Sequence, residues 1–177
     1  MSDEATSLFS QMNKTLRILD IVEDTMVDGP GLRTSIYCAG CGHACKECHN
    51  PQSWNFDGGK EMTVSQVLER IMSNKFDDVT FSGGDPMYQA DSFVALAREI
   101  RAHTSKTIWC YTGFLYESLL NMPAQKALLE EIDVLVDGPY IPALRDIQLR
   151  FRGSSNQRMI DVKASLQKGS VVMWKNN

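Results

Sequence analysis

The stretch 32–48 reads LRTSIYCAGCGHACKEC, and it joins a predicted strand directly to a loop with three closely spaced cysteines. Residues 32–38 combine β-branched and aromatic side chains, which is typical of a strand. Cys41, Cys45 and Cys48 follow in a CxxxCxxC spacing. The segment from Cys41 to Trp54 has no hydrophobic periodicity, so we expect a loop there. A strand that runs into such a loop holds three thiols together at one end of a sheet.

Outside this stretch the chain alternates between predicted strands and predicted helices. The further strands are expected at 16–23, 79–81, 107–111, 133–136, 158–162 and 170–174. Helices are expected behind a capping box at Thr63-Val-Ser-Gln66, from about Asp91, and from Pro123. In the first helix one face is apolar, made by Val64, Val67, Leu68, Ile71 and Met72.

This alternation predicts right-handed βαβ units and a parallel sheet. A closed eight-stranded barrel takes about 250 residues, whereas this chain has 177. We therefore expect an α/β fold whose sheet is an open, partial (β/α) barrel of about five to six mainly parallel strands. No repeat or linker divides the sequence, so residues 1–177 are expected to form one domain, with 1–14 as a flexible N-terminal extension.

Composition narrows the classes of function. The net charge is −4, which does not favour a nucleic acid partner. No apolar run approaches the ~20 residues that span a bilayer, and the polar, acidic N-terminus does not resemble a secretory signal. The five cysteines then favour reduced thiols in the cytoplasm over a disulfide framework.

Four polar or glycine-rich segments each follow a predicted strand. They are the cysteine loop, Gly83-Gly84-Asp85, Thr112-Gly113 and Asp137-Gly138. Ligands of parallel α/β sheets bind at the carboxyl ends of the strands, so these segments are expected on one rim. Thr112 and Asp137 are polar groups that would either bind a ligand there or cap the following turn.

Two kinds of metal site fit the cysteines. A structural zinc ion would need a fourth ligand, for which Cys38 is available in the pair Cys38-Ala-Gly-Cys41. Alternatively, Cys41, Cys45 and Cys48 would hold three irons of a cluster and leave the fourth iron open to another ligand. The residues alone leave both possibilities open.

The motifs resemble those of a known family. Cys-x3-Cys-x2-Cys followed by Gly-Gly-Asp-Pro after the next strand resembles the radical S-adenosylmethionine (SAM) superfamily. Asp28-Gly-Pro-Gly-Leu-Arg33, Cys48-His-Asn-Pro51 and Trp54 are similar to the glycyl-radical-enzyme activases. The segment 152–158 (RGSSNQR) and the short chain are similar to the branch that activates anaerobic ribonucleoside-triphosphate reductase.

The resemblance implies a [4Fe–4S] cluster on Cys41, Cys45 and Cys48, with SAM bound to the open iron. Reductive cleavage of SAM would give a 5′-deoxyadenosyl radical, which takes hydrogen from a glycine of the target enzyme. Gly83 and Gly84 would let the backbone approach SAM, and Asp85 stands where relatives often have Glu. Further contacts to SAM are implied for Glu47, Cys48, His49, Thr112 and Asp137.

The implied partner is the large subunit of anaerobic ribonucleoside-triphosphate reductase, through its glycine loop. A flavodoxin or ferredoxin-type protein would donate the electron. The alternatives are an activase of another glycyl radical enzyme, such as pyruvate formate-lyase, and a small radical SAM enzyme that acts on a pterin, as in deazaguanine synthesis. In a different class, the alternative is a non-enzymatic zinc-binding adaptor.

Overall fold

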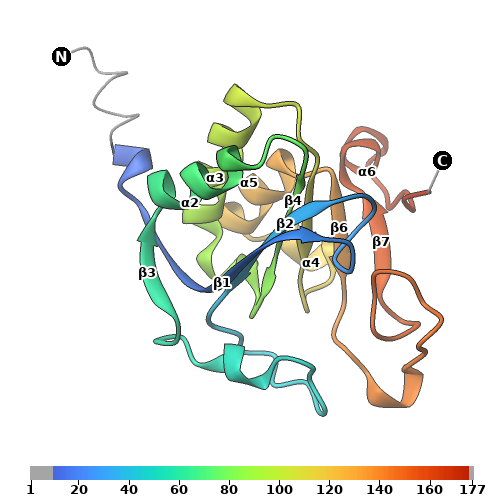
Figure 1. Ribbon diagram of the computed structural model, residues 1–177. Helices are drawn as coiled ribbons and strands as arrows, with labels where there is room; N and C mark the ends of the chain where they lie inside the picture. Colours follow the sequence, from blue (N-terminus) through green and yellow to red (C-terminus); the bar gives the residue numbers. More distant parts are fainter. Residues whose placement is uncertain (1–9, 176–177) are drawn as a thin grey trace.

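The computed structural model describes residues 10–175, which fold around a single mixed β-sheet (Figure 1). The sheet has seven strands in the order β3-β1-β2-β4-β5-β6-β7. Four of them, β2, β4, β5 and β6, are parallel to one another, while β1 and β3 on one side and β7 on the other pair antiparallel. The four parallel strands therefore direct their carboxyl ends to the same rim, as the alternation of strands and helices predicts.

The strands are β1 (Thr15–Thr25), β2 (Arg33–Cys38), β3 (Lys60–Thr63), β4 (Asp78–Gly83), β5 (Ile108–Tyr111), β6 (Val134–Asp137) and β7 (Arg158–Asp161). The α-helices are α2 (Val64–Ser73), α3 (Ala90–His103), α4 (Tyr116–Leu119), α5 (Pro123–Glu131) and α6 (Val162–Lys168). Short 3₁₀ turns lie at Pro51–Trp54, Pro86–Gln89 and Pro142–Leu144. No helix of the described chain is long and apolar enough to cross a membrane.

Helices α2, α3 and α5 gather on one side of the sheet, and the main hydrophobic core lies beneath them (Figure 1). The predicted capping box starts α2: the Thr63 hydroxyl accepts from the Gln66 amide, and the Gln66 side chain accepts from the Thr63 amide. Alternate strand residues supply the core, such as Ile36 from β2 and Phe81 from β4. Phe81 packs on Phe93 of α3 with ring centroids 4.7 Å apart.

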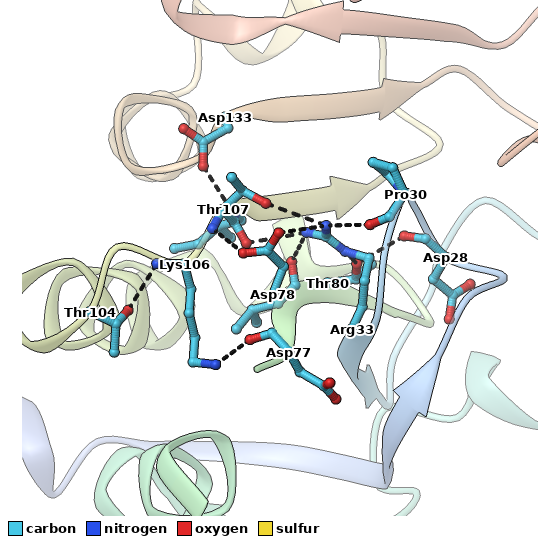
Figure 2. A network of polar contacts seen from close by, with 12 residues as sticks. Asp28, Pro30, Arg33, Asp77, Asp78, Thr80, Thr104, Lys106, Thr107 and Asp133 are labelled. Atoms are coloured by element: carbon cyan, nitrogen blue, oxygen red, sulfur yellow. Dashed lines mark hydrogen bonds and ion pairs between the residues drawn. The ribbon is translucent and has the colours of Figure 1, made fainter. Parts of the chain in front are cut away.

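Arg33 lies on the other face of the sheet, where it is fully buried (Figure 2). Its guanidinium donates to Thr80 Oγ1 at 2.6 Å and to the Val79 carbonyl at 2.5 Å. It also reaches the Pro30 carbonyl at 3.3 Å and lies 5.5 Å from the centre of the Trp109 ring. Burial lowers the pKa of Arg33 to about 10, although Asp78 acts in the opposite direction. This side chain thus joins the amino ends of the parallel strands to the turn before β2.

The sheet has seven strands instead of the expected five to six, because the edge strand β3 joins six of the predicted strands. The edge strand β3 was not predicted, since its sequence, KEMT, lacks the β-branched and aromatic pattern of a strand. The predicted strand 170–174 forms only an isolated bridge between Met173 and Ile160. Helix α6 was also not predicted; it starts where Asp161 accepts a hydrogen bond from the Ala164 amide.

Two smaller expectations concern the first helix and the N-terminus. Met72 was expected in the core, which is wrong: it is 38% exposed, whereas the other four apolar residues of that face are buried. Of the predicted extension 1–14, residues 1–9 lie outside the described residues. Met12 packs against the core, and the Lys14 carbonyl accepts from the Val64 amide at 2.8 Å.

Candidate active site at the carboxyl ends of the parallel strands

A cavity of about 300 Å³ opens at the carboxyl ends of the parallel strands. All three cysteines of the CxxxCxxC motif line it, together with Gly83 and Gly84. Its other lining residues are Asp28, Tyr37, His43, His49, Asn50, Ser82, Tyr111, Thr112, Gly113, Gly138, Tyr140, Gly153 and Gln157. All four segments expected at this rim therefore contribute residues to one cavity.

The cysteine loop crosses directly over the end of β4. The Gly84 amide donates to the Cys38 carbonyl at 2.7 Å, and the Asp85 amide donates to the Gly40 carbonyl at 2.9 Å. A Cβ atom on Gly84 would lie 2.5 Å from the Gly40 carbonyl oxygen, and one on Gly83 would lie 2.6 Å from that of Cys38. Gly83 also has a φ of 102°, which L side chains disfavour. Both glycines are thus required by the protein's own backbone.

The loop bends tightly between its cysteines. Ala44 and Glu47 adopt left-handed backbone conformations with φ of 48° and 56°. Such conformations are costly for residues other than glycine and often accompany functional sites. The Cys48 amide donates to the Cys45 carbonyl at 3.2 Å, and the Asn50 amide donates to the Cys48 sulfur at 3.4 Å. These turns direct all three thiols toward the same cavity.

Three thiols around one cavity are a donor set that suits an iron–sulfur cluster. Within the described residues, no group of three or more His, Cys, Asp or Glu side chains is arranged to hold one metal ion. In a cluster each thiolate binds a different iron, so its ligands stand further apart than the ligands of one ion. Burial raises the pKa of Cys41, and the nearby charges of Cys45 and Cys48 raise it further. A cationic cluster would relieve that repulsion by binding all three as thiolates.

The remaining two cysteines lie apart from the cavity. Cys38 and Cys110 are completely buried, and neither lines the cavity. Burial raises the pKa of both thiols. The Cys38 side chain belongs to the hydrophobic core beneath the sheet. It is therefore not placed to act as a fourth ligand to a metal on the cysteine loop.

Asp85 directs its carboxylate to protein donors. It is fully buried and does not line the cavity. Its oxygens accept from the Met87 amide at 2.9 Å, the Thr112 hydroxyl at 2.8 Å and the Gly113 amide at 3.0 Å. Its fourth partner is the His43 ring, with Nε2 2.7 Å from Oδ2. The family resemblance implies SAM contacts for Gly83, Gly84 and Asp85. The structure brings Gly83 and Gly84 to the cavity, whereas the Asp85 side chain does not reach it.

Asp137 is likewise committed to partners within the protein. It is fully buried, accepts from the Tyr116 amide at 2.8 Å and pairs with Arg158. Arg158 also pairs with Glu117 at 2.8 Å, and the two carboxylates raise the pKa of its guanidinium. Glu47 does not line the cavity either. Among the predicted rim residues, Thr112 and His49 do line it.

Several cavity residues were not predicted from the sequence. Tyr37 and Tyr111 come from β2 and β5, at alternate positions that face away from the helices. The Tyr37 hydroxyl donates to Asp28, and the Tyr111 hydroxyl donates to the Phe151 carbonyl at 2.8 Å. Tyr140 pairs with His49 at a centroid distance of 5.1 Å. Strand alternation could have identified the two strand tyrosines, but only the fold brings Tyr140 to this cavity.

Arg33 explains why Asp28 reaches the cavity. Figure 2 shows the Thr80 side chain between Arg33 and the Asp28 carbonyl, to which its hydroxyl donates at 2.9 Å. Arg33 holds Thr80 and Pro30 at the same time. The Asp-Gly-Pro-Gly turn is therefore fixed from the opposite end of the sheet, with its carboxylate toward the cysteines.

Comparison with known proteins agrees with this site. The chain matches a family described as 4Fe-4S single cluster domain over residues 27–160. The anaerobic ribonucleoside-triphosphate reductase-activating protein of Vibrio cholerae is 37% identical over 141 residues, 75% of this chain and 89% of the relative. The protein of that name from Escherichia coli K12 is 34% identical over 142 residues, 75% of this chain and 90% of the relative.

Among solved structures, QueE from Escherichia coli matches with a TM-score of 0.51 and 16% identity. The match covers 60% of this chain and 56% of QueE, and it shows a shared fold alone. The sequence relatives carry the family assignment, because they are more than 30% identical over most of their length. The chain belongs to the family of the anaerobic ribonucleoside-triphosphate reductase-activating proteins.

Proposed function

We propose that this chain activates anaerobic ribonucleoside-triphosphate reductase by generating a glycyl radical on the large subunit. The observation that carries the proposal is the convergence of Cys41, Cys45, Cys48 and the Gly83-Gly84 backbone on one cavity, in a chain of this family. Such a cavity offers three thiolates and, beside them, two glycines that carry no side chain of their own.

In this proposal Cys41, Cys45 and Cys48 hold a [4Fe–4S] cluster whose fourth iron binds SAM. When bound, the reduced cluster supplies the electron that cleaves SAM to methionine and a 5′-deoxyadenosyl radical, which takes hydrogen from the glycine. Gly83 and Gly84 would contact the methionine end of SAM, while Thr112, His49 and Tyr140 border the remaining space. Glu47 and Asp137, which the family resemblance also implies, would act through backbone or through neighbours, since their side chains do not line the cavity.

The shape of the sheet supports access for a protein substrate. We propose that the seven strands act as an open, partial barrel within one domain, with β3 and β7 as its unpaired edges. An incomplete barrel leaves a side through which a glycine loop of the reductase can reach the cavity. A flavodoxin or ferredoxin-type protein is the proposed electron donor.

The proposal is tested under anaerobic conditions in two stages. First, the purified, reconstituted chain should be brown and contain about four irons, as expected for one [4Fe–4S] cluster. A colourless chain with stoichiometric zinc would instead support the zinc-binding adaptor. Second, the reduced chain, SAM and the reductase should give a glycyl radical doublet in electron paramagnetic resonance.

Two controls make the second stage specific. The Cys45→Ala variant should give no doublet, and neither should a reductase whose radical-site glycine is replaced by alanine. A doublet with pyruvate formate-lyase but none with the reductase would contradict the proposed target and move the assignment to another activase.

A further inference from the structure

The buried carboxylate of Asp85 links three segments of the rim. It follows β4 in the chain, it accepts from Thr112 and Gly113 after β5, and it contacts His43 in the middle of the cysteine loop. Its side chain is 1% exposed, so water competes little for these bonds. The residues are distant in sequence, since 42 positions separate His43 from Asp85.

The partners of Asp85 determine which ring nitrogen of His43 carries a proton. Asp85 Oδ1 accepts from the Met87 amide, and Oδ2 accepts from the Thr112 hydroxyl and the Gly113 amide. Because a carboxylate oxygen is an acceptor, His43 Nε2 must donate, and we assign the proton to that nitrogen from this network. The charge-assisted bond of 2.7 Å is of the stronger class.

Packing holds the His43 ring in this orientation. The ring meets Phe114 edge-on, with centroids 4.6 Å apart, and lies 5.7 Å from Tyr88. A Cβ atom on Gly113 would lie 2.5 Å from the ring, so glycine provides the space for it. The His43 side chain is 17% exposed. Ring rotation would therefore require Phe114, Tyr88 or the backbone at Gly113 to move.

His43 also contacts the thiol that begins the motif. Its backbone amide donates toward the Cys41 sulfur, which lowers the pKa of that thiol against the larger, opposite effect of burial. The residue lies two positions after Cys41 and two before Cys45. The orientation of its side chain thus constrains the backbone that carries two of the three cysteines.

We propose that Asp85 and His43 are positioning residues that lock the cysteine loop onto the strand ends, so that Cys41 and Cys45 are preorganised to hold the cluster. This inference rests on the proposed function, because it assumes that the cysteines bind a cluster. It gives the acidic residue of Gly83-Gly84-Asp85 a role other than SAM binding. Asp85 acts on the cluster through His43, without touching the cluster or its substrate.

The expected effect of replacing His43 or Asp85 can be taken from other residues that support metal ligands without binding the metal. Removing such a residue typically lowers metal affinity about 10–100-fold. His43→Ala removes the ring and leaves the buried carboxylate with one donor fewer. His43→Gln keeps an N–H donor on a side chain of comparable length. Asp85→Asn places an amide NH₂ among neighbours that are all donors, so at least one pair of N–H groups must oppose each other.

The experiment measures how fast each reconstituted chain loses iron to a chelator, together with the electron paramagnetic resonance spectrum of its reduced cluster. We expect His43→Ala and Asp85→Asn to lose iron at least about ten times faster than the wild-type chain. Both variants should also have an altered spectrum. His43→Gln should restore most of the wild-type retention. His103→Ala, a histidine at the end of α3 whose ring contacts Glu99, is the matched control and should behave as wild type.

A double variant separates a coupled pair from two independent effects. If Asp85 acts through His43, the variant with both His43→Ala and Asp85→Asn should lose iron about as fast as His43→Ala alone. Additive effects would overturn the inference, as would wild-type retention and spectrum in His43→Ala. An apo His43→Ala chain that is unfolded by circular dichroism would overturn it too, because the pair would then carry the fold.

These failures differ from failure of the proposed function. If the wild-type chain binds no cluster, the proposed function is wrong and the variants have no reference. If the wild type binds a cluster that His43→Ala retains equally well, only the positioning role is wrong.

Discussion

Replacing Gly84 with alanine should push the cysteine loop away from the end of β4. The added Cβ would lie 2.5 Å from the Gly40 carbonyl oxygen, where ordinary contacts begin at 3.4 Å. The backbone at Gly40 would have to move by about 0.9 Å, the difference between those two distances. That movement also strains the bond from the Asp85 amide to the Gly40 carbonyl.

The size of the effect can be separated from backbone strain. Gly84 has no left-handed φ, so the cost of Gly84→Ala is steric. It should lower the free energy of unfolding by about 1–3 kcal/mol, as at other overpacked sites. Gly169 ends α6 with a φ of 72° and has open space around it, so Gly169→Ala should cost only the left-handed strain of about 1–2 kcal/mol. Gly83 combines both conditions, and Gly83→Ala should cost about 2–5 kcal/mol if the two contributions add.

The assay is thermal and urea unfolding of the apo chain under reducing, anaerobic conditions, followed by iron content after reconstitution. A cost of about 2 kcal/mol corresponds to a fall in Tm of about 4–8 °C for a chain of this size. Gly84→Ala should also bind less iron, whereas Gly169→Ala, whose cost is of similar size but arises at the end of α6, should bind as much as wild type. A Gly84→Ala chain with wild-type Tm and full iron would refute the close approach on which this reasoning depends.

Three further changes follow from the same structure. Arg33→Met should lower the free energy of unfolding by about 1–3 kcal/mol, measured in urea, because the Val79 carbonyl loses its buried donor. The pKa of Glu117 is lowered, mainly by its hydrogen bonds to Arg158, so it contributes stability above its unfolded pKa of 4.5 that is lost as pH falls further. The stability difference between wild type and Glu117→Gln should accordingly shrink below pH 4.5 in urea titrations, and a constant difference would contradict the pairing. Finally, Cys38→Ala should keep full iron content while Cys41→Ala loses it; equal losses would make Cys38 a ligand.

Much of the site was predictable because parallel strands place their carboxyl ends together. Strands ending near Cys38 and Ser82 were expected to bring the cysteine loop beside Gly83-Gly84, and the structure confirms that they share a cavity. The same rule correctly placed Thr112 at the rim. It acts through backbone direction alone, so a pattern of strands and helices is enough to apply it.

Side-chain partners at the rim were less predictable. Asp85 and Asp137 occupy strand ends as expected, but each carboxylate is turned toward protein donors from distant segments, His43 in one case and Arg158 in the other. A buried carboxylate must be paired, and the choice of partner depends on which donors the fold brings within reach. No local pattern in the sequence contains that information.

The sequence by itself indicated a metal site on three cysteines and the edge of the sheet on which that site lies. The cysteine spacing and the strand–helix alternation are local properties, because each depends on backbone geometry within a few residues or on a handed connection between neighbouring elements. Only the tertiary structure decided that Gly84 makes room for Gly40, that Thr80 bonds both Arg33 and the Asp28 carbonyl, and that Asp85 holds His43. These contacts join residues 40 or more positions apart, and their energies exist only when the packed interior excludes water from both partners.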